Sequence, residues 1–192
     1  MSSATPPPSA AATVDPGAFS IIEGWPALSP QDAAVVSEFW RRENAIQNAL
    51  DVAKRIQQVV LYARAASGEV AGVTTAIPML PPRFGQPMYY FRAFVGQAWR
   101  ATPLVRELTI RSCSVLEAYA RERDFPCIGV LLELENTRFY KTLRKPVWWN
   151  PRFYYVGKSE RGLEVRAFYF EGALLKTPAE IQSLRLPPHR DI

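Results

Sequence analysis

The stretch that decides the fold runs from residue 88 to residue 136. It reads MYYFRAFVGQAWR (88–100), ATPLVRELTIRSCSVLEAYARERD (101–124) and FPCIGVLLELEN (125–136). The first piece is typical of a strand, the second of an amphipathic helix, and the third of a strand covered on both faces. We expect the remaining segments to be arranged around this strand–helix–strand unit.

The turn between the first strand and the helix has the features of an anion site. It carries Arg100, and Thr102 is a candidate cap for the helix. In the first turn of a helix that starts here, the backbone N–H groups of Leu104, Val105 and Arg106 have no helical partners. Such amides, together with nearby cations, favour an anionic group such as a phosphate.

The bulk composition limits the classes of protein to consider. The 192 residues suit one domain, and a hydrophobic fraction of 48% is ample for one core. The formal net charge of +5 is spread along the chain, which suits an anionic ligand but is too small to argue for a nucleic-acid partner by itself. The longest basic cluster, 138–145, is short and interrupted by aromatic residues. No apolar run could span a membrane, and the N-terminus lacks a signal-peptide pattern, so we expect a cytoplasmic protein.

Cysteine and histidine chemistry is not expected to carry the function. Cys113 falls within the predicted helix and Cys127 at the start of the next strand, which is typical of buried, reduced thiols. The single histidine, His189, lies in a Pro-flanked C-terminal segment. A Cys/His nucleophile pair and a histidine-based metal site are therefore not predicted, and no metal is expected.

We expect three segments in the chain. Residues 1–17, rich in Ser, Ala and Pro, are predicted to be a disordered tail, and 18–176 to be the folded domain. Residues 177–192 are predicted to be a short helix, opened by a capping box from Thr177 to Glu180, followed by a tail. The order expected in the domain is strand 19–25, helices from 30 and from 45, strands 59–65, 70–79 and 88–95, helix 103–123, strand 128–134, a short helical segment, and strands 152–158 and 163–170.

This order resembles the fold of the GCN5-related N-acetyltransferases (GNAT) over roughly residues 19–170. The segment ARAASGEVAGV (63–73) is similar to the family's turn between its second and third strands. Phe94-Val95 followed by Arg100 is similar to the end of its fourth strand and the start of its pyrophosphate loop. Residues 135–143 are similar to the end of its fifth strand and the segment after it. The resemblance implies an α/β (α+β) fold with a mixed, mostly antiparallel central sheet flanked by helices.

The resemblance also implies an acyl-CoA-dependent N-acyltransferase. Acetyl-CoA or another acyl-CoA would be the cosubstrate, and a small-molecule or peptide amine would attack its thioester directly in a ternary complex. Tyr140 would be the general acid, and Glu133 or Glu135 the general base. Structural roles stay open, such as capping for Thr102 and Asn136 and ion pairing for the glutamates. The residues that would hold the cosubstrate are Phe94, Val95, Arg100, Thr102, Leu104, Val105, Arg106 and Asn136.

The predicted pyrophosphate loop departs from the family's pattern, [RQ]-x-x-G-x-[GA]. Arg100 matches the first position, but Pro103 and Val105 stand where the glycines are expected. Glycine lets the backbone approach a phosphate closely, and proline removes an N–H donor. A second hypothesis therefore stays open, namely a catalytically inactive GNAT-like module that binds a protein partner or forms a homodimer. Adjacent Trp148 and Trp149 are its candidate contact surface.

Overall fold

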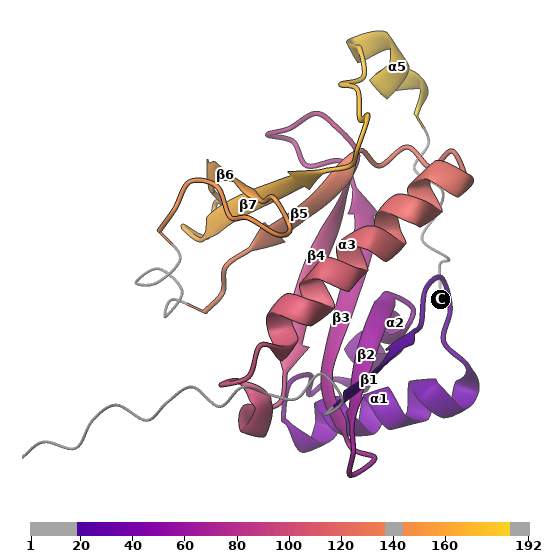
Figure 1. The fold of residues 1–192 in the computed structure, drawn as a ribbon. Helices are drawn as coiled ribbons and strands as arrows, with labels where there is room; N and C mark the ends of the chain where they lie inside the picture. Colours follow the sequence, from indigo (N-terminus) through magenta and orange to yellow (C-terminus); the bar gives the residue numbers. More distant parts are fainter. Residues whose placement is uncertain (1–18, 137–143, 185–192) are drawn as a thin grey trace, which may run out of the picture.

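A computed structural model describes residues 19–136 and 144–184 of the chain. Figure 1 shows how its helices and strands are arranged. In chain order they are β1 (Phe19–Glu23), α1 (Pro30–Arg42), α2 (Ala49–Ile56), β2 (Val59–Ala65), β3 (Val70–Met79), β4 (Met88–Val95), the 3-10 helix η2 (Gln97–Trp99), α3 (Leu104–Glu122), β5 (Gly129–Glu133), β6 (Tyr154–Lys158), β7 (Glu164–Tyr169) and α5 (Pro178–Ser183).

Seven strands form one sheet in the order β1-β2-β3-β4-β5-β7-β6. Within the described part of the chain, β4 and β5 are the only parallel neighbours, and all other neighbouring strands are antiparallel. The long connection between β4 and β5 contains α3, as a parallel pair requires. The predicted mixed, mostly antiparallel sheet flanked by helices is therefore confirmed.

Successive residues of β4 show which helices cover which face of the sheet. Phe91 and Val95 lie in the buried cluster that contains Leu108 of α3. Phe94 points the other way and meets Phe39 of α1, with ring centroids 5.7 Å apart. Because side chains alternate along a strand, α3 covers one face and α1 covers the other (Figure 1).

The helix starts follow local capping, and one of them corrects the sequence prediction. Ser29 caps α1 and Thr177 forms the predicted capping box of α5. The helix predicted from residue 45 begins only at Ala49, because the Asn48 side chain accepts a hydrogen bond from the N–H of Leu50 and caps α2 there. Asn44 has a φ of 53°, which ends the preceding helix and separates the two.

Both cysteines are free and buried, as predicted. Cys113 of α3 and Cys127, just before β5, are 2% and 4% exposed. Burial raises the pKa of both thiols, with Glu117 adding to the effect at Cys113. A reactive thiolate is therefore not available at either position in the folded chain.

Candidate active site

The parallel strands β4 and β5 pair along only part of β4. Their register ends where Phe91 lies opposite Leu132, whereas β4 stays paired with β3 as far as Val95. Within the described ranges 19–136 and 144–184, residues 92–95 therefore have no strand partner on the side of β5. Figure 1 shows the two strands meeting at one end and separating towards the start of α3. Backbone groups on this side of β4 are not used by a neighbouring strand of the described chain, so they are candidates for binding a ligand.

The hydrogen-bond pattern of β3 and β4 shows which amides face the opening. Gly96 donates its N–H to the carbonyl of Ala71 on β3, at 2.9 Å. In an antiparallel ladder, successive residues alternate between facing the partner strand and facing away. Val95 and, two residues earlier, Ala93 therefore direct their N–H groups towards the opening, whereas the N–H of Phe94 faces β3.

The turn before α3 uses most of its own donors. The N–H of Leu104 donates to Oγ1 of Thr102 at 3.3 Å, and the N–H of Arg106 donates to the carbonyl of Pro103 at 3.0 Å. The expectation that these two amides are unpaired was therefore wrong, because the turn closes on itself. Only the N–H of Val105 keeps no hydrogen bond to the described residues. The N-cap of α3 is Pro103 and not Thr102, although the Thr102 hydroxyl accepts the hydrogen bond from Leu104.

The two arginines at this turn differ in their surroundings. Arg100 folds back over the end of β4, where its Nε donates to the carbonyl of Val95 at 3.2 Å and its guanidinium lies 5.7 Å from the Phe94 ring centroid. Arg106 is exposed in the first turn of α3. Asn136 is exposed just beyond the end of β5. The cations expected to attract an anion are thus present, one of them anchored to the edge of the opening.

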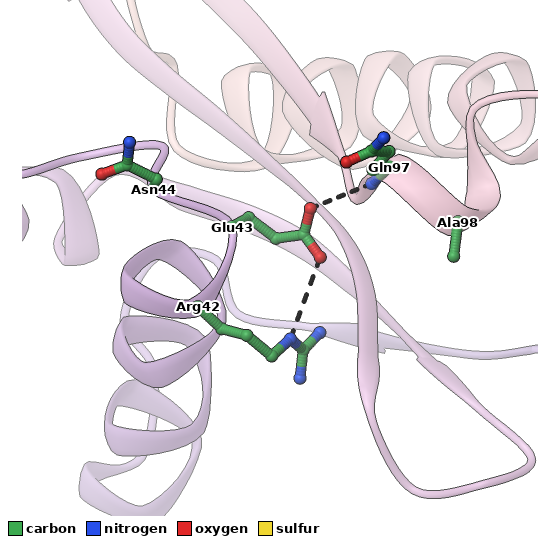
Figure 2. Close-up of a pocket in the computed structure, with 5 residues that line it drawn as sticks. All are labelled: Arg42, Glu43, Asn44, Gln97 and Ala98. Carbon is green, nitrogen blue, oxygen red and sulfur yellow. Dashed lines mark hydrogen bonds and ion pairs between the residues drawn. The ribbon is translucent and has the colours of Figure 1, made fainter.

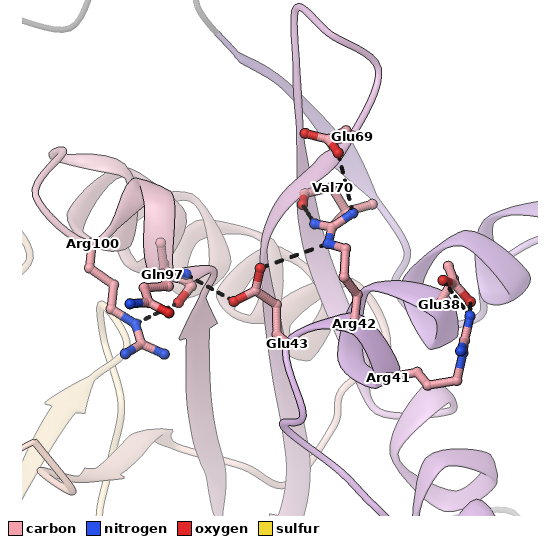
Figure 3. A network of polar contacts seen from close by, with 9 residues as sticks. Glu38, Arg41, Arg42, Glu43, Glu69, Val70, Gln97 and Arg100 are labelled. Atoms are coloured by element: carbon pink, nitrogen blue, oxygen red, sulfur yellow. Dashed lines mark hydrogen bonds and ion pairs between the residues drawn. The ribbon is translucent and has the colours of Figure 1, made fainter.

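A carboxylate that the sequence analysis did not single out also reaches this turn. Oε2 of Glu43 accepts a hydrogen bond from the N–H of Gln97 at 2.9 Å, and Arg42 lies beside it, with Nε 3.8 Å from Oε1 (Figure 2). Arg42 also bonds to the β2–β3 turn, at Glu69 and at the carbonyl of Val70 (Figure 3). This network borders a shallow cavity of about 510 Å³ lined by Arg42, Glu43, Asn44, Gln97 and Ala98.

The glutamates predicted as candidate bases are both ion-paired. Arg161, in the turn between β6 and β7, places Nη1 3.4 Å from Glu133 and 3.2 Å from Glu135. The Glu133 side chain is 16% exposed and that of Glu135 is 58% exposed, so Glu133 is the more enclosed of the two. Tyr140, the predicted general acid, lies outside the described residues.

Tyr90 and Arg92 lie on β4 at the opening, on the face covered by α1 and α2, and Arg55 of α2 is close enough to interact electrostatically with both. Along β4, Tyr90 and Arg92 point to the opposite face from Phe91. Tyr90, Arg92 and Arg55 are each half-buried. Sequence reasoning followed the apolar positions of this strand and missed the complementary set. The signal was present, because a charged residue in the middle of a buried strand needs an explanation.

The adjacent tryptophans occupy different environments, as their spacing predicts. Trp148 is half-buried and stacks on the buried Arg166, whose guanidinium carbon lies 3.9 Å from the Trp148 ring. Trp149 is 68% exposed, with Arg152 4.9 Å from its ring. Only Trp149 is therefore available as a contact surface.

Comparison with known proteins identifies the fold. The sequence matches no protein-family model, and a search of curated proteins gives no significant match. Among solved structures, an acetyltransferase of the GNAT family from Streptococcus pneumoniae matches with a TM-score of 0.54 and 14% identity, over 79% of this chain and 99% of that chain. NAA60 from Arabidopsis thaliana, solved in complex with a bisubstrate analogue, matches with a TM-score of 0.51 and 14% identity, over 80% and 99%. A bacterial toxin matches with a TM-score of 0.51 and 10% identity, over 87% and 96%.

At these identities the likeness is one of fold, and the chain has the GNAT fold that its sequence predicts. The comparison places the β4–β5 opening and the start of α3 within a known architecture. Within the described residues, no group of three or more His, Cys, Asp or Glu side chains is arranged to hold a metal ion. In the same part of the chain, no helix is both long enough and apolar enough to cross a membrane.

Proposed function

We propose that this protein is an acyl-CoA-dependent N-acyltransferase that transfers an acetyl or other acyl group to an amine. The observation that carries the proposal is the opening between β4 and β5, into which the backbone N–H groups of Ala93 and Val95 point. Such fixed donors can stabilise the negative charge that develops on a thioester oxygen during acyl transfer. The GNAT fold of the whole domain supports this assignment.

The proposed reaction is direct attack in a ternary complex. The amine nitrogen forms a bond to the thioester carbonyl carbon, the C–S bond breaks, and the proton lost by the amine ends on the leaving sulfur. The chain's contribution is to hold the two reactants together and to exclude water. Tyr140 is proposed to supply the proton to the sulfur. Glu133 or Glu135 is proposed to accept the amine's proton, after the carboxylate separates from Arg161.

The residues at the start of α3 fit the phosphate groups of an acyl-CoA in part. Arg100, Arg106 and the N–H of Val105 favour an anion, with Thr102 fixing the turn. Pro103 offers no donor, and the Glu43 carboxylate already holds the N–H of Gln97. We therefore expect weaker binding than an intact glycine-containing loop would give.

The second candidate function is a catalytically inactive GNAT-like module that binds a protein partner or a second copy of itself. The residues at the two glycine positions and the exposed Trp149 favour it. Light scattering on the purified chain, together with an acyl-CoA titration, separates the candidates. A homodimer that binds no acyl-CoA would favour the module, whereas a monomer that turns over acyl-CoA would exclude it. The cytoplasmic location and the small-molecule or peptide nature of the acceptor stay predictions.

The proposed activity is tested by following the free thiol released from acetyl-CoA and from longer acyl-CoAs, with panels of amines and peptides as acceptors. The chain's own buried cysteines should give little background with a thiol reagent. Amine-dependent thiol release would support the proposal. Release that occurs without an amine would indicate hydrolysis, and no release together with no binding would contradict the proposal.

A further inference from the structure

The face of the sheet covered by α1 and α2 carries a charged cluster at the mouth of the β4–β5 opening. Tyr90 and Arg92 of β4 lie on this face of the sheet. Glu133 of β5 lies on the same face, because it is paired with Val165, which belongs to the same buried cluster as Met88 of β4. The guanidinium carbon of Arg92 lies 4.5 Å from the centroid of the Tyr90 ring. The side of the opening away from α3 is therefore polar.

Two cations of this cluster, Arg55 and Arg92, form no close ion pair within the described part of the chain, although Glu135 and Asp51 act on Arg55 from a greater distance. Arg161 takes up both Glu133 and Glu135, at 3.4 Å and 3.2 Å. Neither Arg55 nor Arg92 forms an ion pair with any described residue, although both are half-buried. A guanidinium group that loses part of its hydration favours a partner, because desolvation of a charge is costly.

The surroundings of Arg55 agree with this. Its pKa is lowered, first by burial and then by the neighbouring positive charge of Arg92, and the opposing influence of Tyr90, Glu135 and Asp51 does not outweigh these two effects. Two like charges held near each other in a partly desolvated place would both be stabilised by an anion between them. Arg92 lies three residues before Val95 and faces away from α3, so this pair is separate from the cations at the start of α3.

We infer that the acceptor amine carries a carboxylate, and that Arg55 and Arg92 hold this carboxylate at the mouth of the β4–β5 opening. The inference rests on the proposed N-acyltransferase function and names the substrate class for the same site. A carboxylate suits two guanidinium groups because it accepts several charge-assisted hydrogen bonds. It could belong to a free amino acid or to an acidic residue next to the reactive amine of a peptide.

Matched acceptors test the inference. One pair is an amino acid and its α-amide, and the other is a peptide whose second residue is Asp or Asn. We expect kcat/KM to be at least about tenfold higher for the carboxylate member of the relevant pair, as a charge-assisted hydrogen bond predicts. Arg92→Gln and Arg55→Gln should each remove most of this preference. The pair that shows the preference identifies the source of the carboxylate.

Arg121→Gln is the matched control, because it removes the same charge from an exposed position in the last turn of α3. It should leave the preference intact. No preference in the unaltered protein, or a preference that survives in both variants, would overturn the inference. Circular dichroism spectra of the three variants should match that of the unaltered protein.

Binding measurements separate this inference from the proposed function. If the chain does not bind acetyl-CoA, the proposed function itself fails. Acetyl-CoA should bind equally well to the unaltered protein and to Arg92→Gln. The acceptor that carries the carboxylate should then raise the thermal midpoint of the acetyl-CoA complex of the unaltered protein. It should not raise the midpoint of the acetyl-CoA complex of Arg92→Gln. A thermal midpoint that does not respond to the carboxylate, together with no preference in turnover, would contradict the carboxylate site and leave the proposed N-acyltransferase function intact. Weaker acetyl-CoA binding by Arg92→Gln would mean that these arginines hold a phosphate of the cosubstrate, which would also overturn the inference.

Discussion

The Glu43 carboxylate accepts a hydrogen bond from the N–H of Gln97 at 2.9 Å, and so joins the connection after α1 to the loop that precedes α3. The two residues are 54 positions apart in the sequence. This contact fixes the loop in which the phosphate groups of an acyl-CoA are proposed to bind. It also brings a negative charge to that loop, where it opposes an anion.

Replacing Glu43 should therefore strengthen acyl-CoA binding. Glu43→Gln keeps an oxygen that can accept the Gln97 hydrogen bond but removes the charge, so we expect affinity for acetyl-CoA to rise about two- to threefold at low salt and less at high salt. Isothermal titration calorimetry measures the change. Glu38→Gln, which removes a charge from an exposed position of α1, is the control. Equal or weaker affinity in Glu43→Gln would show that the carboxylate does not act on the bound anion.

We predict that the hydroxyl group of Tyr89 does not add to the free energy of unfolding. Its ring is fully buried and stacked on Phe125, with centroids 5.6 Å apart, and its hydroxyl has no hydrogen-bond partner among the described residues. Because a buried unpaired hydroxyl is unfavourable, Tyr89→Phe should leave the free energy of unfolding unchanged or raise it by up to about 1 kcal/mol. Urea denaturation measures this. A loss of more than about 1 kcal/mol would reveal a partner for the hydroxyl.

The hydrogen bond between Tyr62 and Asp32 predicts a dependence of stability on pH. This bond, followed by one from Ser29, lowers the pKa of Asp32 below its ordinary value of 3.8. A carboxyl group with a lowered pKa in the folded state stabilises the fold above its unfolded pKa, and this contribution disappears as the pH falls through the folded pKa. Asp32→Asn should thus be less stable at pH 7, by no more than about 1 kcal/mol because the group is partly exposed.

At a pH below the folded pKa of Asp32, the difference between Asp32→Asn and the unaltered protein should be smaller. Denaturation midpoints at neutral pH and in a series of acidic buffers below pH 4 provide the comparison. A difference that is the same at every pH would show that the charge of Asp32 does not contribute to stability.

The two thiols are predicted to be inert in the folded protein. Cys113 and Cys127 are both buried and their pKa values are raised by burial, so neither should react with a thiol reagent until the chain unfolds. Absorbance with an aromatic disulfide should report no rapid reaction in buffer and two thiols per chain in denaturant. Rapid labelling of either cysteine in buffer would contradict the described packing.

The sequence predicts the elements of this fold well because their signals are local. The β-rich composition of residues 59–65 and 70–79, with the turn at Gly68 between them, matches β2 and β3. The amphipathic pattern that predicts a helix over 103–123 matches α3 to within one residue at each end. The helix expected from residue 45 differs most in its start, because Asn48 supplies a cap that hydrophobic periodicity does not reveal. The strand expected from residue 152 begins at Tyr154.

The candidate site is less predictable because its contacts join distant segments. The pairing of Glu133 and Glu135 with Arg161 depends on how the β6–β7 hairpin lies beside β5, and no spacing in the sequence indicates it. Arg55 of α2 and Arg92 of β4 influence each other electrostatically although they belong to separate elements, and no spacing in the sequence indicates this. The register between β3 and β4 decides which amides of 92–95 face away from β3. The sequence does not show that β5 separates from β4 at this point and leaves these amides unpaired by a strand of the described chain.

Calorimetric titration with acetyl-CoA tests the central claim most directly. We predict that the chain binds acetyl-CoA with a Kd between about 1 μM and 1 mM, the range in which enzyme substrates commonly fall. Arg100→Ala should weaken binding about tenfold, since it removes a cation at the proposed phosphate site, whereas Arg111→Ala, an exposed position further along α3, should not. No binding at millimolar acetyl-CoA would contradict the N-acyltransferase proposal, and unchanged affinity in Arg100→Ala would show that the phosphate site lies elsewhere.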